Sequence, residues 1–459
     1  MKNLTLTNKF RLPLVILLLC AVGIIIGCDG KKDRKGVIIV LLDALRRDHL
    51  SFYGYDRRTS PFLDSLIKRG IFFKNVVSAA PQTVPSVSSL LTGIYPYRHG
   101  SHFFSVPQSY HPTRSVALGG LPLMKKENLL LAEVFTQAGY RTAAISSNPG
   151  IRNIYGFAQG IEYFRYVDCF SETGAGVCDG SKINRVFEND VLPRIKEEDF
   201  FVYLHYMDVH NPYLKPNSFK GRFMKYNGEP VYVNGKPDSI SPEQLEYSQA
   251  RYDDGIIYLD SLIKELFKII EDAGLAKDTL IIIVTDHGDE FMEHGGLGHG
   301  TTCYNELINS FILMINPALK PGIFETPASL VDVFPTVLDW AGIDPPANLD
   351  GLSLLPGLKD RKSVALDAKR VLIAELGDRK AIIDGDMKFI YNLDTKKAEL
   401  YDTAKDPGET RNLEQARKDI ANRYLAKMKQ IVKKMTVSYS VKTLGKSELK
   451  TLESLGYIH

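Results

Sequence analysis

The sequence has almost no excess of charge of either sign. Its 57 lysines and arginines stand against 54 aspartates and glutamates, which is a formal net charge of +3. Three of the basic residues, Lys2, Lys9 and Arg11, precede Cys28, and without them the chain has 54 residues of each sign. Proteins that bind nucleic acid need a basic surface to meet the phosphate backbone. The balance therefore gives no electrostatic reason to expect a nucleic-acid partner.

A long apolar run is missing as well. The most apolar N-terminal stretch extends from Leu12 to Ile26, about 15 residues, whereas a transmembrane helix needs roughly 20. Basic residues precede it, and its end, Ile-Ile-Gly-Cys28, resembles a bacterial lipobox. We therefore predict a lipoprotein signal peptide over 1–27, a lipid anchor at Cys28 and a polar tether over 28–35. An uncleaved signal anchor is the alternative. Both forms place the body outside the cytoplasm, in the periplasm or on the outer cell surface, tethered to a membrane.

Cysteine is scarce. Cys20 is lost with the signal peptide and Cys28 is committed to the anchor, which leaves Cys169, Cys178 and Cys303. An extracytoplasmic compartment permits disulfides, and Cys169 and Cys178 flank a glycine-containing loop that a disulfide would close. Spacing alone does not fix the geometry, so the paired and unpaired states both stay open. Cys303 is expected to be a buried free thiol.

Apolar runs alternate with helical patterns through the first three quarters of the chain. Apolar content of 44% and charged content of 24% are ordinary for a globular protein, and the length suits one large α/β domain plus a smaller one. Alternating strands and helices predict a mostly parallel sheet covered by helices on both faces. Strands are expected at 36–43, 71–76, 141–145, 200–205 and 279–285, and helices at 59–69, 129–138 and 242–272.

The pattern changes after about residue 355. Short strands separated by turns predict a small antiparallel sheet, and a helix with a charged outer face follows at 413–435. Its lysines are expected to form a solvated surface, with a lipid-binding patch as the alternative. We therefore divide the chain into a catalytic domain, 36–355, and a C-terminal subdomain, 356–459. The expected strands of the subdomain are 371–375, 380–383, 388–391 and 399–401.

Polar residues stand where two of the predicted central strands end. Asp43 follows the first strand, and the pair Asp286-His287 follows a later one. Open α/β sheets place their ligand sites at these carboxyl ends. Thr83 precedes a helix that is expected to start at a proline, where a helix N-terminus attracts an oxyanion. Two aspartates and a histidine around this hydroxyl would hold a metal that lowers its pKa, which predicts transfer of a phosphate-like or sulfate-like group to Thr83. In the alternative, Thr83 is a helix cap and Ser86 is the reactive hydroxyl.

Seven segments in order resemble segments of the sulfatase family, part of the alkaline phosphatase superfamily. The resemblance extends from about Gly36 to the C-terminus and implies an alkaline-phosphatase-like sheet sandwiched by helices, with a smaller C-terminal antiparallel sheet plus helix. It also implies an ester-hydrolysing, metal-dependent enzyme. The segments begin at Asp43, Thr83, Tyr206, Thr285, Gly298, Ser329 and Leu400.

The sequence departs from this family at the nucleophile. Sulfatases have a cysteine or serine that is oxidised to formylglycine, with an arginine four residues later; here the two positions are Thr83 and Val87. Threonine serves as nucleophile in phosphodiesterases and phosphotransferases of the superfamily, where a phospho-threonine is resolved by water or an alcohol. We therefore favour phosphate or phosphonate esters as substrates. Sulfate ester hydrolysis is the alternative, and a non-catalytic lipoprotein that binds anions or glycans is an alternative of another class.

The resemblance also suggests the metal ligands. Sulfatases usually have a second aspartate beside the first, which completes a calcium site, and here that position is Ala44. The remaining set has three oxygen ligands and one nitrogen, which suits zinc or manganese better than calcium. This first set is Asp43, Thr83, Asp286 and His287.

A second metal site is expected beside the first. His299 stands at the position of a sulfatase lysine, and with Asp208 and His210 it would bind a second ion, giving one or two ions in total. In the alternative, Asp208 and His210 only hydrogen-bond substrate oxygens, and His299 is a cationic clamp on the transferred group. In either case His210 and His299 join Thr83 as the expected catalytic residues.

The other polar residues near these motifs are expected to be structural. His205 and His294 fall in this group, Arg46 is expected to order the loop around Asp43, and Asp48 to cap the turn that follows. The substrate class stays open among small-molecule, glycan and lipid-headgroup esters. Segments 163–182 and 219–241, which would set specificity, have no readable pattern.

Overall fold

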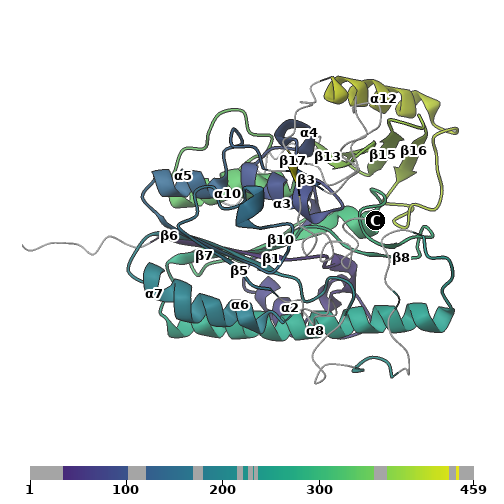
Figure 1. Ribbon diagram of the computed structural model, residues 1–459. Coiled ribbons are helices and arrows are strands. Elements are labelled where there is room, and N and C mark those ends of the chain that lie inside the picture. Colours follow the sequence, from purple (N-terminus) through teal and green to yellow (C-terminus); the bar gives the residue numbers. More distant parts are fainter. Residues whose placement is uncertain are drawn as a thin grey trace, which may run out of the picture. The chain divides into compact units, whose positions relative to one another are not determined.

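A nine-stranded sheet lies at the centre of the structure, between two layers of helices (Figure 1). The structure is a computed structural model. It describes residues 35–101, 120–122, 124–168, 179–213, 221–225, 231, 236–355, 370–433 and 441–443.

The strand order places β1 in the middle of the sheet. β10 is antiparallel to both of its neighbours, β2 and β7, and every other pair in this sheet is parallel. The order is β11 (Gly322–Phe324), β2 (Ile71–Val77), β10 (Asn309–Ile315), β7 (Thr279–Thr285), β1 (Gly36–Leu42), β6 (Phe200–Tyr206), β4 (Arg141–Ser146) and β5 (Tyr163–Tyr166), with β12 (Ala328–Ser329) paired to β2.

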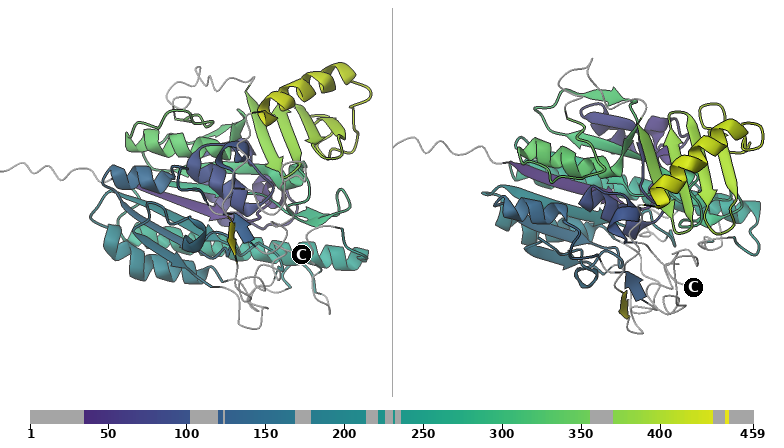
Figure 2. Two further views of the ribbon diagram at one scale, coloured as in Figure 1. Left: turned by 45° about the horizontal axis from the view of Figure 1, so that its top comes forward. Right: turned by 90° about the horizontal axis from the view of Figure 1, so that it is seen from above.

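Helices cover both faces of the sheet, as the alternating pattern predicted (Figures 1 and 2). The two faces form two separate apolar cores, and successive residues of β1 contribute to them in turn: Val37, Ile39 and Leu41 to one, Ile38, Val40 and Leu42 to the other. This alternation explains why a strand buried on both faces reads as a continuous apolar run. One layer contains α3 (Thr83–Thr92), α5 (Leu131–Gln137) and α10 (Val333–Ala341), and the other contains α2 (Pro61–Ile67), α6 (Ser181–Val186) and α8 (Pro242–Asp272).

The C-terminal part contains a separate four-stranded antiparallel sheet with one helix, α12 (Lys418–Val432), packed on it (Figure 2). The sheet was predicted, whereas the helix begins five residues later than the predicted start at Leu413. The backbone N–H of Leu413 donates to the carbonyl of Leu400 at 2.7 Å, so Leu413 is tied to the edge strand and cannot start the helix. The strands are β13 (Val371–Leu376), β14 (Arg379–Asp384), β15 (Met387–Asn392) and β16 (Ala398–Asp402).

The two sheets share apolar contacts. Leu372, Ile390 and Tyr401 of the small sheet form one buried cluster with Leu307 and Ile308, which precede β10. Cys303 lies in the same cluster as a buried free thiol, as predicted. The short helices are α4 (Pro96–His99), α7 (Leu192–Ile195) and α9 (Asn305–Ile308). Two further strand pairs are β3 (Gly120–Pro122) with β17 (Val441–Thr443) and β8 (Glu290–Phe291) with β9 (Leu297–Gly298). A π-helical turn lies at Phe187–Val191, and 3-10 turns lie at Arg47–His49, Ser51–Tyr53, Asn153–Tyr155 and Leu330–Asp332.

Several predictions fall on other parts of the chain. The signal peptide, the anchor at Cys28, the bridge between Cys169 and Cys178 and the boundary at residue 356 all lie outside the described residues. Within the described ranges, no helix has both the length and the apolar character that crossing a membrane would require.

Candidate active site

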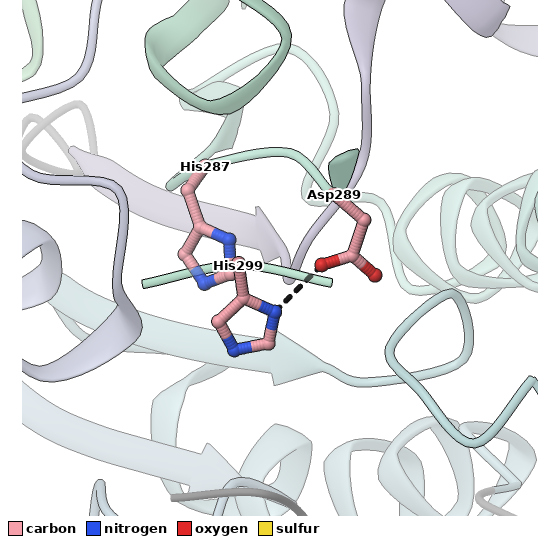
Figure 3. Close-up of side chains that lie close together, drawn as sticks. All are labelled: His287, Asp289 and His299. Carbon is pink, nitrogen blue, oxygen red and sulfur yellow. Dashed lines mark hydrogen bonds and ion pairs between the residues drawn. The ribbon is translucent and has the colours of Figure 1, made fainter. Parts of the chain in front are cut away.

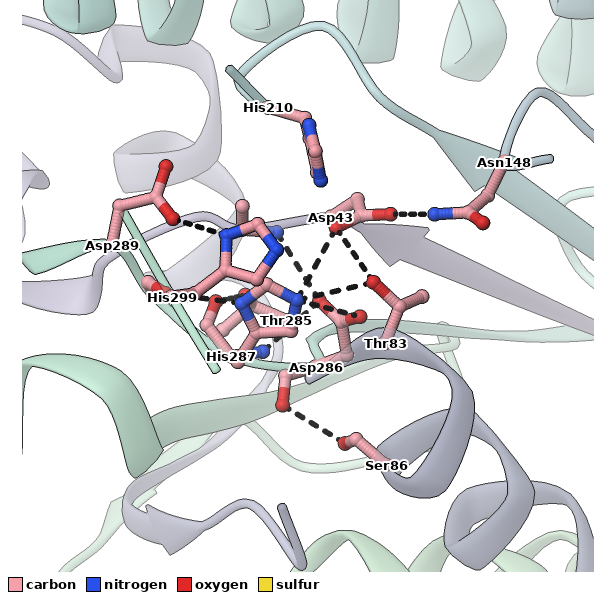
Figure 4. Close-up of polar contacts among 12 residues, drawn as sticks. Asp43, Thr83, Ser86, Asn148, His210, Thr285, Asp286, His287, Asp289 and His299 are labelled. Carbon is pink, nitrogen blue, oxygen red and sulfur yellow. Dashed lines mark hydrogen bonds and ion pairs between the residues drawn. The ribbon is translucent and has the colours of Figure 1, made fainter. Parts of the chain in front are cut away.

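Three parallel strands direct polar residues to one edge of the central sheet. Asp43 follows β1, Asp286 follows β7 and Asn148 lies two residues beyond β4. The register pairs Leu42, the last residue of β1, with the last residues of both β6 and β7, so the chain leaves all three strands at the same level. The predicted site residues other than Asp208 therefore meet at the carboxyl edge of the sheet (Figure 4).

The two carboxylate oxygens of Asp43 have separate partners. Oδ2 accepts hydrogen bonds from Asn148 Nδ2 at 2.7 Å and from His205 Nε2 at 2.8 Å. Oδ1 is 3.5 Å from Thr83 Oγ1 and 3.6 Å from His287 Nε2. Burial raises the pKa of Asp43, but the hydrogen bond from His205 and the nearby histidines outweigh it, so the net shift is downward. The carboxylate is thus held ionised with one oxygen directed at Thr83.

The two oxygens of Asp286 differ in their hydrogen bonds, and Oδ2 lies 3.6 Å from His287 Nε2. Oδ1 accepts from the backbone N–H groups of Ala44 at 3.2 Å and His287 at 3.0 Å. Oδ2 is buried and has no hydrogen-bond partner among the described residues. Burial first, and then the charge of Asp43, raise the pKa of Asp286 well above its usual range. Two buried carboxylates, one with an orphaned oxygen, are the surroundings that a bound cation would stabilise.

Thr83 is the first residue of α3, because the cap position is Gln82. The helix thus starts two residues before the expected proline, Pro85, which lies in the first turn, where the missing N–H costs no helical bond. The Thr83 hydroxyl is 3.1 Å from His287 Nε2. Ser86, the alternative nucleophile, instead donates to the backbone carbonyl of Asp286 at 2.9 Å. Thr83 is therefore the hydroxyl beside the carboxylates, and Ser86 supports the segment behind them (Figure 4).

Three histidines each direct Nε2 towards this centre. Nδ1 of His287 lies 3.0 Å from the Gly288 carbonyl, and Nδ1 of His210 lies 2.8 Å from the Asn211 carbonyl. Nδ1 of His299 is 2.6 Å from a carboxylate oxygen of Asp289. Because these oxygens accept, we assign a proton to Nδ1 of each ring, so that Nε2 is the ring nitrogen that faces the centre. Metal-binding and phosphate-binding histidines are commonly oriented in this way.

The histidine rings lie close together in a buried environment. The ring centroid of His299 is 4.4 Å from that of His287 and 4.9 Å from that of His210. Burial, followed by the neighbouring His299, lowers the pKa of His287 to about 3. Burial also lowers the pKa of His210. Neutral rings with a lone pair on Nε2 suit metal coordination.

Two of the three candidate groups of metal ligands among the described residues overlap at this centre. Asp43, Asp286 and His287 offer ligand atoms within 4.8 Å of one another, and so do His287, Asp289 and His299. Asp208, predicted for a second metal, belongs to neither group; its carboxylate accepts from the backbone N–H of Gly180 at 2.9 Å.

Two of the residues in the site were not predicted. Asn148 follows an apolar strand just as Asp43 does, and Asp289 comes two residues after His287, so both positions carried a signal. His205, predicted to be structural, supports Asp43 through its ring. Arg46 orders the loop as predicted: it donates to Asp48, to Glu293 and to the carbonyl of Asp289.

The fold and this polar centre define an α/β enzyme that works at the carboxyl edge of a largely parallel sheet. The family model named Sulfatase matches residues 35–343, and the chain therefore belongs to the sulfatase family. It is an ester-hydrolysing enzyme, and the predicted family and fold are confirmed.

The chain is similar in sequence to sulfatases and to a protein of the alkaline phosphatase superfamily, and similar in fold to a phosphonate monoester hydrolase. N-acetylgalactosamine-6-sulfatase of Homo sapiens is 26% identical over 388 residues, which cover 77% of this chain and 72% of that enzyme. A multifunctional alkaline phosphatase superfamily protein of Trinickia caryophylli is 25% identical over 411 residues, covering 72% of this chain and 78% of that protein. The phosphonate monoester hydrolase of Agrobacterium radiobacter has a similar fold, with a TM-score of 0.70 and 17% identity over 90% of this chain and 97% of that one.

Proposed function

We propose that this enzyme is a hydrolase or transferase that depends on a divalent metal and acts on phosphate or phosphonate esters, with Thr83 as the nucleophile. The position of the Thr83 hydroxyl carries the proposal: it lies 3.1 Å from His287 Nε2 and 3.5 Å from Asp43 Oδ1. Threonine cannot supply the aldehyde that the sulfatase resemblance would require at this position. A hydroxyl at the first turn of α3 also faces the positive end of a helix, which favours an anionic group.

The ligands for the metal would be Asp43, Asp286 and His287, together with the hydroxyl of Thr83. The orphaned Oδ2 of Asp286 and the adjacent carboxylate of Asp43 fit a cation. A divalent ion supplies the charge that lowers the pKa of the hydroxyl and offsets the two carboxylates. The imidazole ligand favours zinc or manganese, and Ala44 supplies no further carboxylate for calcium.

The reaction has two steps at Thr83. In the first, Thr83 Oγ1 forms a bond to phosphorus while the bond to the leaving oxygen breaks; the threonine loses its proton and the leaving oxygen gains one. In the second, the oxygen of water or of an acceptor alcohol forms a bond to phosphorus and loses its proton, while the bond from phosphorus to Thr83 Oγ1 breaks and Oγ1 regains a proton. His210 and His299 direct Nε2 to the same centre and would bind oxygens of the transferred group, or a second ion.

Sulfate ester hydrolysis is the second candidate. The family model and the human sulfatase among the relatives favour it. The Trinickia caryophylli protein, named as multifunctional, and the phosphonate monoester hydrolase of similar fold support the phosphorus esters. The substrate is an ester of a small molecule, a glycan or a lipid headgroup.

We also propose that the enzyme is anchored outside the cytoplasm through Cys28. The test is whether the Cys28→Ser variant is released from the membrane.

The test uses full-length protein stripped of metal and reloaded singly with zinc, manganese or calcium. Matched nitrophenyl esters (phosphate monoester, phosphodiester, phosphonate monoester and sulfate) serve as substrates. We expect zinc- or manganese-dependent turnover of phosphorus esters, loss of about 10³-fold or more in Thr83→Ala, and partial activity in Thr83→Ser. A phosphorylated Thr83 peptide after acid quenching would mark the intermediate. Turnover of the sulfate alone, or full activity of Thr83→Ala, would disprove the proposal.

A further inference from the structure

Asp289 is a buried carboxylate with a partner on each oxygen. Oδ1 accepts from Nδ1 of His299 at 2.6 Å, and Oδ2 accepts from the hydroxyl of Tyr213 at 2.9 Å. All three side chains are almost completely buried. The register of the β8–β9 ribbon pairs Glu290 with Gly298, so Asp289 and His299 stand next to each other where the ribbon ends (Figure 3).

We propose that Asp289, itself held by Tyr213, is a positioning residue that fixes the tautomer and the direction of His299 during ester transfer. The proposal rests on the proposed function, in which Nε2 of His299 meets the transferred group. A carboxylate that accepts from Nδ1–H keeps the lone pair of the neutral ring on Nε2 and stops the ring from turning. Tyr213 in turn stops the carboxylate from rotating away.

The contacts argue against Asp289 as a metal ligand, although it forms a candidate group with His287 and His299. Both of its oxygens already accept short hydrogen bonds, whereas Oδ2 of Asp286 accepts none among the described residues. Nδ1 of His299 also cannot bind a metal while it donates to Asp289. The pair therefore has the geometry of a histidine and its orienting carboxylate.

The backbone around the pair is fixed from two sides. Arg46 donates to the backbone carbonyl of Asp289 at 3.0 Å, and its guanidinium is anchored by Asp48 and Glu293. Tyr213 adopts a left-handed backbone with φ of 60°, which is uncommon for a bulky residue. Such conformations persist where the surroundings impose them, and they concentrate at functional sites. Here the strained backbone delivers one hydroxyl to one carboxylate oxygen.

The chain contains a matched arrangement away from this centre. Asp253 accepts from His49 Nδ1 at 2.8 Å and from the Tyr55 hydroxyl at 2.8 Å. The ring of His49 packs against aromatic rings, including those of Tyr55 and Tyr252, whereas the ring of His299 packs against His287 and His210. Each carboxylate accepts from a histidine Nδ1 and a tyrosine hydroxyl, and Asp253 accepts in addition from Arg57 at 2.8 Å. Only Asp289 contacts a histidine of the site. Asp253→Asn is therefore the control for Asp289→Asn.

The experiment compares Asp289→Asn, Tyr213→Phe and Asp253→Asn in the zinc-loaded full-length enzyme. We expect Asp289→Asn to lower kcat by about 10²-fold and Tyr213→Phe by about 10-fold, with smaller changes in KM. Asp253→Asn should lower the unfolding temperature but leave kcat unchanged. Spectra of 15N-labelled histidine, assigned with His299→Gln, should show the Nδ1–H tautomer of His299 in the wild type and the Nε2–H tautomer in Asp289→Asn.

The outcomes separate this proposal from the proposed function. An unchanged His299 tautomer in Asp289→Asn, or a kcat that falls no further than in Asp253→Asn, overturns the positioning role. The kinetic comparison is made on whichever nitrophenyl ester the wild type cleaves, sulfate included. If Thr83→Ala keeps its activity, the proposed nucleophile fails, while the tautomer of His299 still decides the role of Asp289.

Discussion

The two carboxylate oxygens of Asp43 have different roles. Its Oδ2 is held by Asn148 and His205, and His205 Nδ1 lies 2.9 Å from the hydroxyl of Tyr203. Oδ1 is the oxygen that faces Thr83, so its direction depends on the two residues that hold Oδ2. Such outer partners typically change metal affinity or activity by 10–100-fold when they are removed.

We predict that Asn148→Ala weakens zinc binding by about 10-fold or more, because Asp43 then loses a donor and can rotate. The measurement is competition with a chromophoric chelator on metal-free protein. Asn184→Ala is the control: Asn184 is equally buried but bonds to Glu265 and Tyr206, so it should cost stability and leave zinc affinity unchanged. Equal zinc affinities of the two variants would contradict the role given to Asn148.

A second residue-scale prediction concerns His294, which lies near the site without serving it. Its Nδ1 is 2.9 Å from Glu306 Oε1. Burial alone would lower the pKa of His294, but the contact with Glu306 outweighs burial and raises this pKa to about 9. Because the folded-state pKa lies above the ordinary 6.5, the pair stabilises the fold fully below about pH 6.5, and this is lost as pH rises through about 9. Partial exposure limits the effect to about 1 kcal/mol.

Urea unfolding at pH 6.5 and pH 9.5 tests this, and Glu306→Gln should flatten the difference. The exposed pair of Lys268 and Asp272 provides the control, because Asp272→Asn should leave the pH dependence as it is. A stability difference in the wild type that survives in Glu306→Gln would assign the effect to another group.

At the scale of elements, one short segment after β7 supplies three residues of the candidate site. Asp286, His287 and Asp289 follow one another around Gly288, whose backbone N–H donates to the Leu307 carbonyl at 3.0 Å. A Cβ on Gly288 would lie 2.1 Å from the carbonyl oxygen of Glu306. The neighbour is backbone, so the segment itself would have to move.

Gly288→Ala should therefore destabilise the protein by about 1–3 kcal/mol and weaken zinc binding at the same time. Thermal unfolding and chelator competition measure the two effects. The matched change is Gly408→Ala, where the nearest atom, Thr410 Cγ2, is 3.7 Å from the added carbon. If Gly288→Ala behaves like Gly408→Ala, the close approach to Glu306 does not constrain the segment.

At the scale of the whole molecule, buried polar contacts hold the small sheet to the region before β10. Lys388 Nζ is 2.8 Å from Glu409 Oε1, and both residues are almost fully buried. The other oxygen of Glu409 accepts from the backbone N–H of Asn305 at 2.6 Å. The small sheet is thus joined to the catalytic part by polar bonds as well as by the shared apolar cluster.

We predict that Glu409→Gln lowers the free energy of unfolding by about 3 kcal/mol, because Lys388 remains buried without its counter-charge. Lys405→Gln breaks the exposed pair with Asp402 and should leave stability unchanged. Denaturant unfolding of both variants gives the comparison. Equal stabilities would mean that the buried pair adds nothing over its hydrogen bonds.

Local patterns in the sequence were enough to predict the central strands, the small sheet and the family. Short continuous apolar runs such as 36–42 are typical of strands buried on both faces, and Asp43 and Asp286 were found because they follow such runs. The first residues of helices were less predictable. α12 begins after Leu413, because the backbone of Leu413 bonds to Leu400, and α3 begins before its proline.

The sequence by itself therefore determined the family, the α/β sheet and the candidate set of Thr83, two aspartates and a histidine, because each rests on neighbours in the chain. Only the tertiary structure decided that the side chain of Asn148 donates to Asp43. It also decided that the carboxylate of Asp289 bonds to His299. The two donors to Asp43 Oδ2, Asn148 and His205, are more than 100 residues away in sequence, and the pairing of Asp289 depends on the β8–β9 register. Local propensity carries no information on such contacts, because they exist only once the strands and the ribbon have been brought together.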